Sequence, residues 1–146
     1  MKLMMLLGYA VMSLPLLSAG AVKAATQGPR PLVEPMFVRA NLAGMDMTAG
    51  YLTITNTTNK VIHLTKVTSP LAEKVEIHDS RLENGIVKMR QVDSLEIPVG
   101  DMARFEPKGK HLMLTGLKHE LKSGDTVALE LHFDALSVKT VLPVHE

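Results

Sequence analysis

The 146-residue chain contains no cysteine and no tryptophan, and its only aromatic residues are two Tyr and three Phe. The absence of cysteine excludes disulfide scaffolds, zinc–thiolate sites, iron–sulfur clusters and thiol nucleophiles. The few stacking rings and a formal net charge of +1 argue against a nucleic-acid surface, which needs basic and aromatic side chains. Common catalytic motifs are also missing, among them the G-x-S-x-G elbow and the Gly-rich phosphate loop. We therefore expect a protein that is not an enzyme and binds no nucleic acid.

The N-terminal residues have the pattern of a secretory signal peptide. A positive start at Lys2 is followed by an apolar stretch over residues 3–17 and by small residues that offer cleavage after residue 21 or, as we prefer, after residue 24. The apolar stretch is shorter than the roughly 20 residues that span a bilayer, so no stable membrane insertion is expected after cleavage. We predict a signal peptide at residues 1–24, a flexible leader at 25–33 and one exported domain at 34–146.

The predicted domain consists of short β-branched or alternating runs separated by turn residues, which is typical of an all-β sandwich. The expected strands are 37–41, 50–56, 61–67, 74–78, 86–91, 95–97, 102–105, 111–115, 126–133 and 138–144. Turn residues lie between them, for example at Glu83-Asn84-Gly85. No segment has a sustained helical period, so we expect little helix, with residues 117–122 as the best place for one short turn.

Methionine and histidine are the unusual components of this domain. Of the ten Met and six His in the chain, six Met and all six His follow the predicted signal peptide. Four of these residues lie on or beside expected strands: His78, Met89, His111 and Met113. Because side chains alternate across a sheet, His111 and Met113 share one face if Leu112 and Leu114 point into the core. By the same argument, Glu76 and His78 share the outer face of their strand.

A core or surface role is the alternative for each of these side chains. Alternation groups Met89 with Val87 and favours its burial, since methionine often fills gaps in cores. His78 and His111 could each be an ordinary surface or hydrogen-bonded histidine. Met113 is less easily explained by packing, because it alternates with the two core leucines beside it.

The other methionines and histidines give weaker signals. Met102 is expected in the core, and Met36 in the core or at a strand edge. Met45 and Met47 lie in a predicted loop and are candidates for auxiliary ligands or for the rim of a site. The remaining histidines lack sulfur neighbours at strand spacing, and we expect them at the surface: His63, His119, His132 and His145.

If the four side chains converge, two imidazoles and two thioethers form one donor set. Thioethers are soft, neutral ligands that suit Cu(I) and bind zinc, magnesium or calcium poorly. A blue-copper electron-transfer centre needs a Cys thiolate, so a carrier of Cu(I) is more plausible than a redox relay. Binding should weaken below about pH 6.5, because a protonated imidazole cannot coordinate a metal.

At these residues the sequence resembles the PCuAC family of periplasmic copper chaperones. The family signature is His or Met, ten residues, Met, twenty-one residues, His, one residue and Met, and His78, Met89, His111 and Met113 satisfy every interval. The segments 47–52, 95–98 and 111–117 also resemble the family, and the similarity extends over about residues 34–144.

The resemblance implies a cupredoxin-like β-sandwich with Greek-key-type connections, a periplasmic location and Cu(I) as the bound ion. It also implies delivery of copper to the CuA site of cytochrome c oxidase, with oxidase subunit II and a Sco-type thiol protein as partners. Some relatives have a His- and Met-rich tail with a Cu(II) site, whereas this sequence ends at Val144-His145-Glu146. Periplasmic copper buffering without an oxidase client is the main alternative function. A copper oxygenase is disfavoured, because such sites need more His ligands or an N-terminal histidine.

Overall fold

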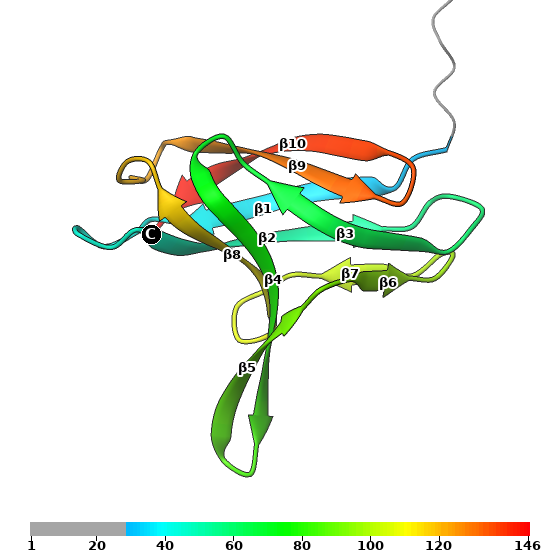
Figure 1. Cartoon of the computed structure of the whole chain (residues 1–146), viewed down its shortest axis with the longest axis horizontal. Helices are drawn as coiled ribbons and strands as arrows, with labels where there is room; N and C mark the ends of the chain where they lie inside the picture. Colours follow the sequence, from blue (N-terminus) through cyan, green and yellow to red (C-terminus); the bar gives the residue numbers. More distant parts are fainter. Residues whose placement is uncertain (1–28) are drawn as a thin grey trace, which may run out of the picture.

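The computed structural model describes residues 29–146, which form ten β-strands and no helix (Figure 1). The strands are β1 (Leu32–Arg39), β2 (Met47–Thr55), β3 (Ile62–Thr68), β4 (Ala72–Glu83), β5 (Ile86–Val92), β6 (Leu95–Ile97), β7 (Met102–Arg104), β8 (Lys110–Leu117), β9 (Thr126–Phe133) and β10 (Ser137–His145). The predicted signal peptide and residues 25–28 of the leader lie outside the described residues. Because β1 begins at Leu32, regular structure starts two residues before the predicted domain boundary.

Seven strands close into a flattened barrel in the order β4-β8-β2-β1-β10-β9-β3, and the ring is completed where β3 pairs with β4 at Val67 and Val75. The other three strands are attached to this ring: β5 pairs with β4, β6 with β3, and β7 with β2. The prediction of an all-β, cupredoxin-like fold with little helix is confirmed. The seven barrel strands form one sheet that is closed on itself.

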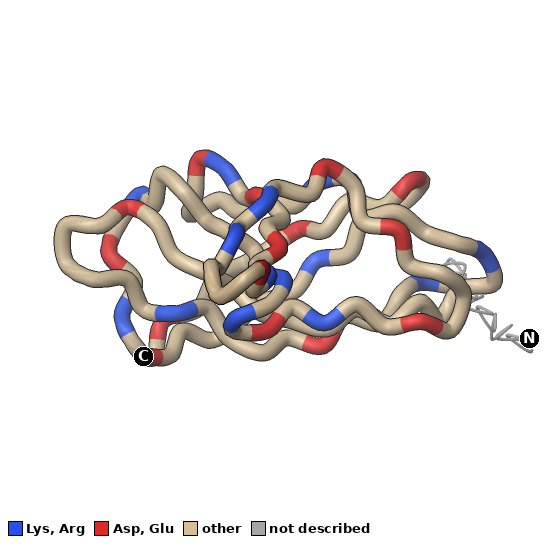
Figure 2. Tube along the Cα trace, turned by 90° about the horizontal axis from the view of Figure 1, so that it is seen from below, with Lys and Arg blue, Asp and Glu red and all other residues tan. Residues whose placement is uncertain are grey.

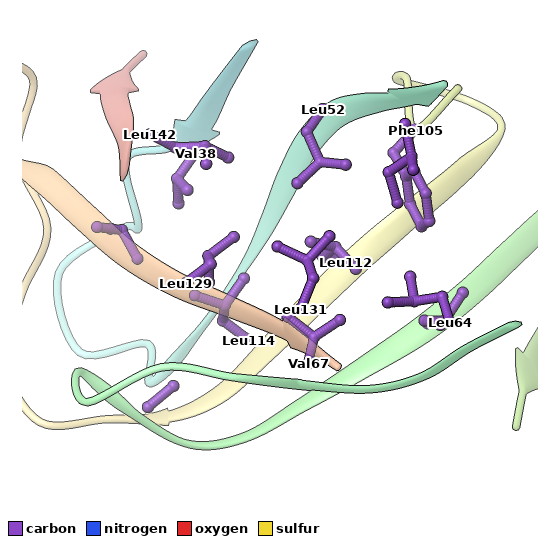
Figure 3. Close-up of a cluster of buried hydrophobic side chains, with 14 of the residues drawn as sticks. Val38, Leu52, Leu64, Val67, Phe105, Leu112, Leu114, Leu129, Leu131 and Leu142 are labelled. Atoms are coloured by element: carbon purple, nitrogen blue, oxygen red, sulfur yellow. The ribbon is translucent and has the colours of Figure 1, made fainter. Parts of the chain in front are cut away.

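The interior of the barrel is filled by aliphatic side chains from alternate positions of the strands (Figure 3), together with Phe105 and Phe133. In β9, for example, Val127, Leu129, Leu131 and Phe133 are buried, whereas the intervening residues are partly or fully exposed. In β8, Leu112 and Leu114 are both completely buried. This alternation directs His111, Met113 and Thr115 to the outer face of the barrel.

The strand β4 is longer than the barrel requires, and with β5 it projects from the barrel as a hairpin (Figure 1). Residues 72–79 pair with β8, whereas residues 77–83 pair with β5. The hairpin ends in the two-residue turn Asn84-Gly85, whose φ angles of 52° and 78° match a type I′ turn. The short segment around His78 therefore belongs to both the barrel and the hairpin.

Two packing predictions and one secondary-structure prediction were wrong, and each has a physical reason. Met102 is 46% exposed, because Ala103 and Phe105 take the inward positions of its segment and place Met102 on the opposite face. Met89 is 52% exposed, because the projecting hairpin lies beyond the core. The expected helical turn at 117–122 is absent: β8 continues to Leu117 and an irregular segment follows.

Charged residues of both signs are interspersed over the described part of the chain (Figure 2). This mixture agrees with the nearly balanced composition of the sequence. A basic stripe of the kind that binds nucleic acid is not formed by residues 29–146.

Candidate metal centre

The four residues predicted to bind copper lie on three neighbouring strands. Met89 is on β5, His78 is on β4, and His111 and Met113 are on β8, in the strand order β5-β4-β8. These strands meet where the hairpin leaves the barrel. Residues more than thirty positions apart in the sequence are thus brought to one region by strand pairing.

The two histidines are directly opposite each other in the β4–β8 pair. Their rings lie edge to face, with centroids 5.7 Å apart and planes at 69°. His111 is buried, at 7% exposure, and the side chain of His78 is 16% exposed. The alternation argument correctly placed both imidazoles on the side away from Leu112 and Ile77, which are buried in the core.

A backbone contact orients the ring of His111. Its Nδ1 lies 3.0 Å from the carbonyl oxygen of Gly109. That oxygen only accepts hydrogen bonds, so Nδ1 carries the hydrogen and donates it, which leaves the lone pair of Nε2 available. A backbone carbonyl that fixes the second ring nitrogen in this way is a common feature of metal-binding histidines.

Met89 reaches His78 from the hairpin. Its Sδ lies 3.2 Å from Nδ1 of His78, although Met89 pairs in register with Ser80 and not with His78. Metal–nitrogen and metal–sulfur bonds of about 2.0 and 2.3 Å, the values known for zinc sites, place two ligands of a tetrahedral ion about 3.5 Å apart. The nitrogen and the sulfur are therefore already close to the separation that one shared ion requires.

Met113 lies two positions beyond His111 on the same face of β8 and is partly buried. In register it is opposite Glu76 of β4 and Ala49 of β2. The pairs His78–His111 and Glu76–Met113 are consecutive on this face, so they form a compact block of four side chains. The register thus brings Met113 next to the two histidines.

Glu76 is a neighbour of the site that the sequence placed on the outer face but assigned no role. Its Oε2 is 3.2 Å from Nε2 of His78, and the side chains of Glu76 and His78 are both about 15% exposed. Lys74 forms an ion pair with the other carboxylate oxygen. The hydrogen bond from Lys74 holds the pKa of Glu76 below its ordinary value, so the carboxylate is ionised at neutral pH. Its position two residues before His78 was the available sequence signal.

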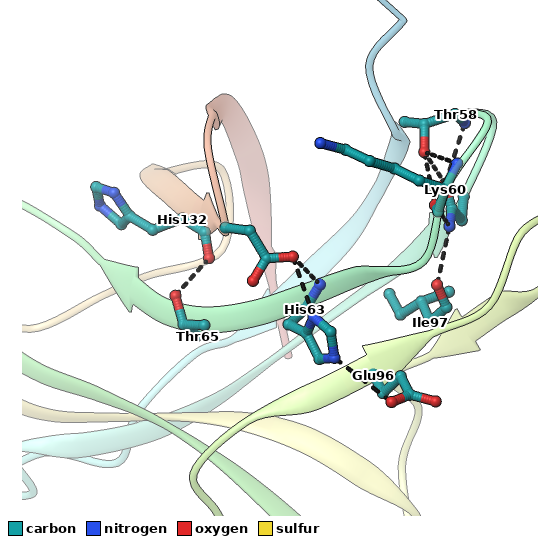
Figure 4. A network of polar contacts seen from close by, with 9 residues as sticks. Thr58, Lys60, His63, Thr65, Glu96, Ile97 and His132 are labelled. Atoms are coloured by element: carbon teal, nitrogen blue, oxygen red, sulfur yellow. Dashed lines mark hydrogen bonds and ion pairs between the residues drawn. The ribbon is translucent and has the colours of Figure 1, made fainter.

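Three of the four remaining histidines have other polar partners. His63 lies between two carboxylates, with Nδ1 3.0 Å from Asp134 and Nε2 3.4 Å from Glu96 (Figure 4). His132 contacts the hydroxyl of Thr68, and His119 contacts a neighbouring backbone carbonyl. These contacts give the three histidines local polar roles, as expected for residues near the surface.

Met45 and Met47 are both exposed, at 48% and 43%. Met47 is opposite Thr115 in the β2–β8 pair and therefore shares the face of Met113. This position agrees with the prediction that Met47 is an auxiliary ligand or part of the rim of the site, which stays a prediction. Met45 lies in the preceding turn, where its backbone accepts a hydrogen bond from Asn41.

A profile of the family described as "Putative lipoprotein LpqE-like" matches residues 32–144. The chain belongs to this PCuAC-type family. A relative from Leifsonia xyli subsp. xyli, "Putative lipoprotein Lxx21020", is 31% identical over 132 residues, which cover 89% of this chain and 78% of the relative. "Uncharacterized protein RP573" of Rickettsia prowazekii is 33% identical over 94 residues, which cover 64% of this chain and 52% of that protein.

Two solved structures of copper-loaded proteins are similar to this chain. The solution structure of CuI-DR1885 from Deinococcus radiodurans has a TM-score of 0.64 and 31% identity, and the match covers 85% of this chain and 84% of that one. The copper-bound PCuAC domain from PmoF2 has a TM-score of 0.65 and 21% identity, with 77% and 89% covered. The second comparison establishes a shared fold.

Within the described part of the chain, no helix has the length and apolar character needed to cross a membrane.

Proposed function

We propose that this protein is an exported carrier of Cu(I), which binds the ion through His78, Met89, His111 and Met113. The main supporting observation is the contact between Met89 Sδ and His78 Nδ1 at 3.2 Å, beside the paired ring of His111. A methionine that is half exposed has no packing reason to hold its sulfur against an imidazole nitrogen. The Cu(I)-loaded state of the related protein DR1885 supports the same ion.

The donor set favours a carrier over a permanent metal site. All four ligands are neutral, and thioether sulfur is a soft ligand that suits Cu(I). The buried His111 and the partly buried His78 form the fixed part of the site. Met89 is the exposed ligand, so it can be displaced first by a donor atom of a recipient protein. The ion then passes on by exchange of one ligand at a time.

We further propose that the carrier works in the periplasm and delivers copper toward the CuA site of cytochrome c oxidase. Oxidase subunit II would be the recipient, and a Sco-type thiol protein would take part in the transfer. The N-terminal sequence pattern and the lipoprotein names of the family and of one relative support export. The family membership supports the copper-chaperone role.

A direct test of copper binding is a titration of the protein with Cu(I) under reducing conditions. We expect one ion per chain, with affinity that falls as the pH drops below about 6.5, the ordinary pKa of imidazole. A protein that binds no Cu(I), or binds it equally well at pH 5 and pH 7.5, would contradict the proposed donor set.

The delivery role is tested by deleting the gene and measuring the copper content of the oxidase. A dedicated carrier predicts an oxidase that is deficient in CuA at low external copper. A fully metallated oxidase would instead favour periplasmic copper buffering.

A further inference from the structure

Glu76 is a charged side chain in direct contact with the proposed copper ligand His78, and this contact indicates which ring nitrogen of His78 carries the hydrogen. An ionised carboxylate can only accept a hydrogen bond. Because Oε2 of Glu76 lies 3.2 Å from Nε2 of His78, Nε2 must carry a hydrogen and donate it. In a neutral imidazole the other nitrogen then has a free lone pair. That nitrogen is Nδ1, the atom that lies 3.2 Å from the sulfur of Met89.

Glu76 is itself held in place. Lys74 forms an ion pair with Oε1, while Oε2 faces His78. Residues 74, 76 and 78 are alternate positions of one strand and therefore lie in a row on one face of β4. The row continues through His78 to Met89 on the next strand. The side chains of Glu76 and His78 are largely shielded from water, so their hydrogen bond is worth more than an exposed one.

We infer that Glu76 is a positioning residue for copper binding, which holds the ring of His78 so that Nδ1, and not Nε2, coordinates the ion. This inference rests on the proposed Cu(I) function. The two histidines then use different nitrogens: His78 binds through Nδ1, with Nε2 held by a carboxylate, and His111 binds through Nε2, with Nδ1 held by the carbonyl of Gly109. The carboxylate also places one negative charge beside a site whose four ligands are neutral.

The ring N–H group of His78 donates to the charged carboxylate of Glu76, whereas the ring N–H group of His111 donates to the neutral carbonyl of Gly109. A carboxylate behind a metal-bound imidazole raises the basicity of the ring and fixes its orientation, and loss of such a partner typically costs about 10- to 100-fold in metal affinity. We expect a loss of this size for Glu76→Ala. The isosteric Glu76→Gln variant keeps an oxygen that can accept from Nε2 but removes the charge, so its loss should be smaller.

The experiment combines Cu(I) affinity with nitrogen-15 NMR of the histidine rings in wild type, Glu76→Ala and Glu76→Gln. In the copper-free wild type we expect a hydrogen on Nε2 of His78 that exchanges slowly with water and a nuclear Overhauser effect between the His78 ring and the Met89 methyl. Both signals should be lost in Glu76→Ala. On addition of Cu(I), the coordination shift should occur at Nδ1 of His78 and at Nε2 of His111. Glu34→Ala is the control, since Glu34 is an exposed strand carboxylate on β1, and it should behave like wild type.

Two results would overturn the inference. One is wild-type Cu(I) affinity in Glu76→Ala, and the other is a coordination shift at Nε2 of His78. The measurements without copper separate this inference from the proposed function. If the wild type binds no Cu(I), the carrier function fails even when the hydrogen on Nε2 is seen. If copper binds and the ring signals do not depend on Glu76, only the positioning role fails.

Discussion

At the scale of single residues, Met89 combines exposure with a specific contact. Its side chain is 52% exposed, yet its sulfur lies against Nδ1 of His78. Exposure means that little free energy of folding depends on this side chain. Under the proposed function, copper binding does depend on Met89, because its sulfur contacts a nitrogen of the proposed ligand His78. Stability and metal affinity should therefore respond very differently to its replacement.

We predict that Met89→Leu lowers the affinity for Cu(I) by at least about tenfold, or about 1.4 kcal/mol, because leucine has no donor atom. The free energy of unfolding should change by less than about 0.5 kcal/mol. Competition with a Cu(I) chelator and chemical denaturation measure the two quantities. Met102→Leu is a matched control, since Met102 is a methionine on β7 whose side chain is exposed to a similar extent. Equal copper affinities in the two variants would remove Met89 from the site.

His63 provides a pH-dependent contribution to stability that is separate from the metal site. Its hydrogen bond to Asp134, assisted by Glu96, raises the pKa of His63 above the ordinary 6.5. The same contact lowers the pKa of Asp134. A histidine whose pKa is higher in the folded state stabilises the fold at pH values below 6.5, and this stabilisation is lost as the pH rises through the folded-state pKa.

The prediction is that His63→Gln destabilises the protein more at pH 5.5 than at pH 8.5. Thermal unfolding of both proteins at the two pH values measures the difference, and an NMR titration of the ring protons reports the raised pKa directly. A difference in melting temperature that is constant between the two pH values would show that protonation of His63 does not contribute.

At the scale of elements, the β4–β5 hairpin determines whether Met89 reaches the site. The turn needs positive φ at both central positions, and Asn84 and Gly85 are the residues that adopt it at least cost. The hairpin carries exposed apolar residues, Leu82, Ile86 and Val87. Little core packing holds it, so its geometry depends on strand pairing and on the turn.

We therefore expect Gly85→Val to disturb the hairpin far more than the barrel, because a β-branched residue at φ 78° is strained. Amide hydrogen exchange should become faster in β5 and in the end of β4, while the barrel strands β9 and β10 keep their protection. Affinity for Cu(I) should fall with it, because Met89 is no longer held against His78. Unchanged exchange in β5 would mean that packing and not the turn determines the hairpin.

The sequence predicted the positions of the strands better than it predicted which strand faces are covered by other parts of the protein. Period-two alternation and turn residues predicted most strands to within a few residues, and residues 126–133 agree completely with β9. Alternation also placed His78, His111 and Met113 correctly on outer faces. It failed for Met89, because alternation indicates which residues share a face and not whether anything covers that face.

At the scale of the whole molecule, closure of the barrel supports the site. His78 and His111 lie on β4 and β8, which are adjacent strands of the closed ring, while Met89 comes from the hairpin outside it. The ring is closed by the antiparallel β3–β4 pairing, in which Val67 lies opposite Val75. No local sequence pattern indicates such a pairing, so the closure of the sheet could not be predicted from the sequence alone. For the same reason, the approach of Glu76 to His78 could be expected as a shared face but not as a hydrogen bond.

The most direct test of the account is X-ray absorption at the copper edge of the Cu(I)-loaded protein, with wild type, Met89→Leu and Met113→Leu compared. We predict nitrogen and sulfur scatterers together in the wild type, with a smaller sulfur contribution in each variant. A copper shell without sulfur, or one that neither substitution changes, would contradict a site made from two imidazoles and two thioethers.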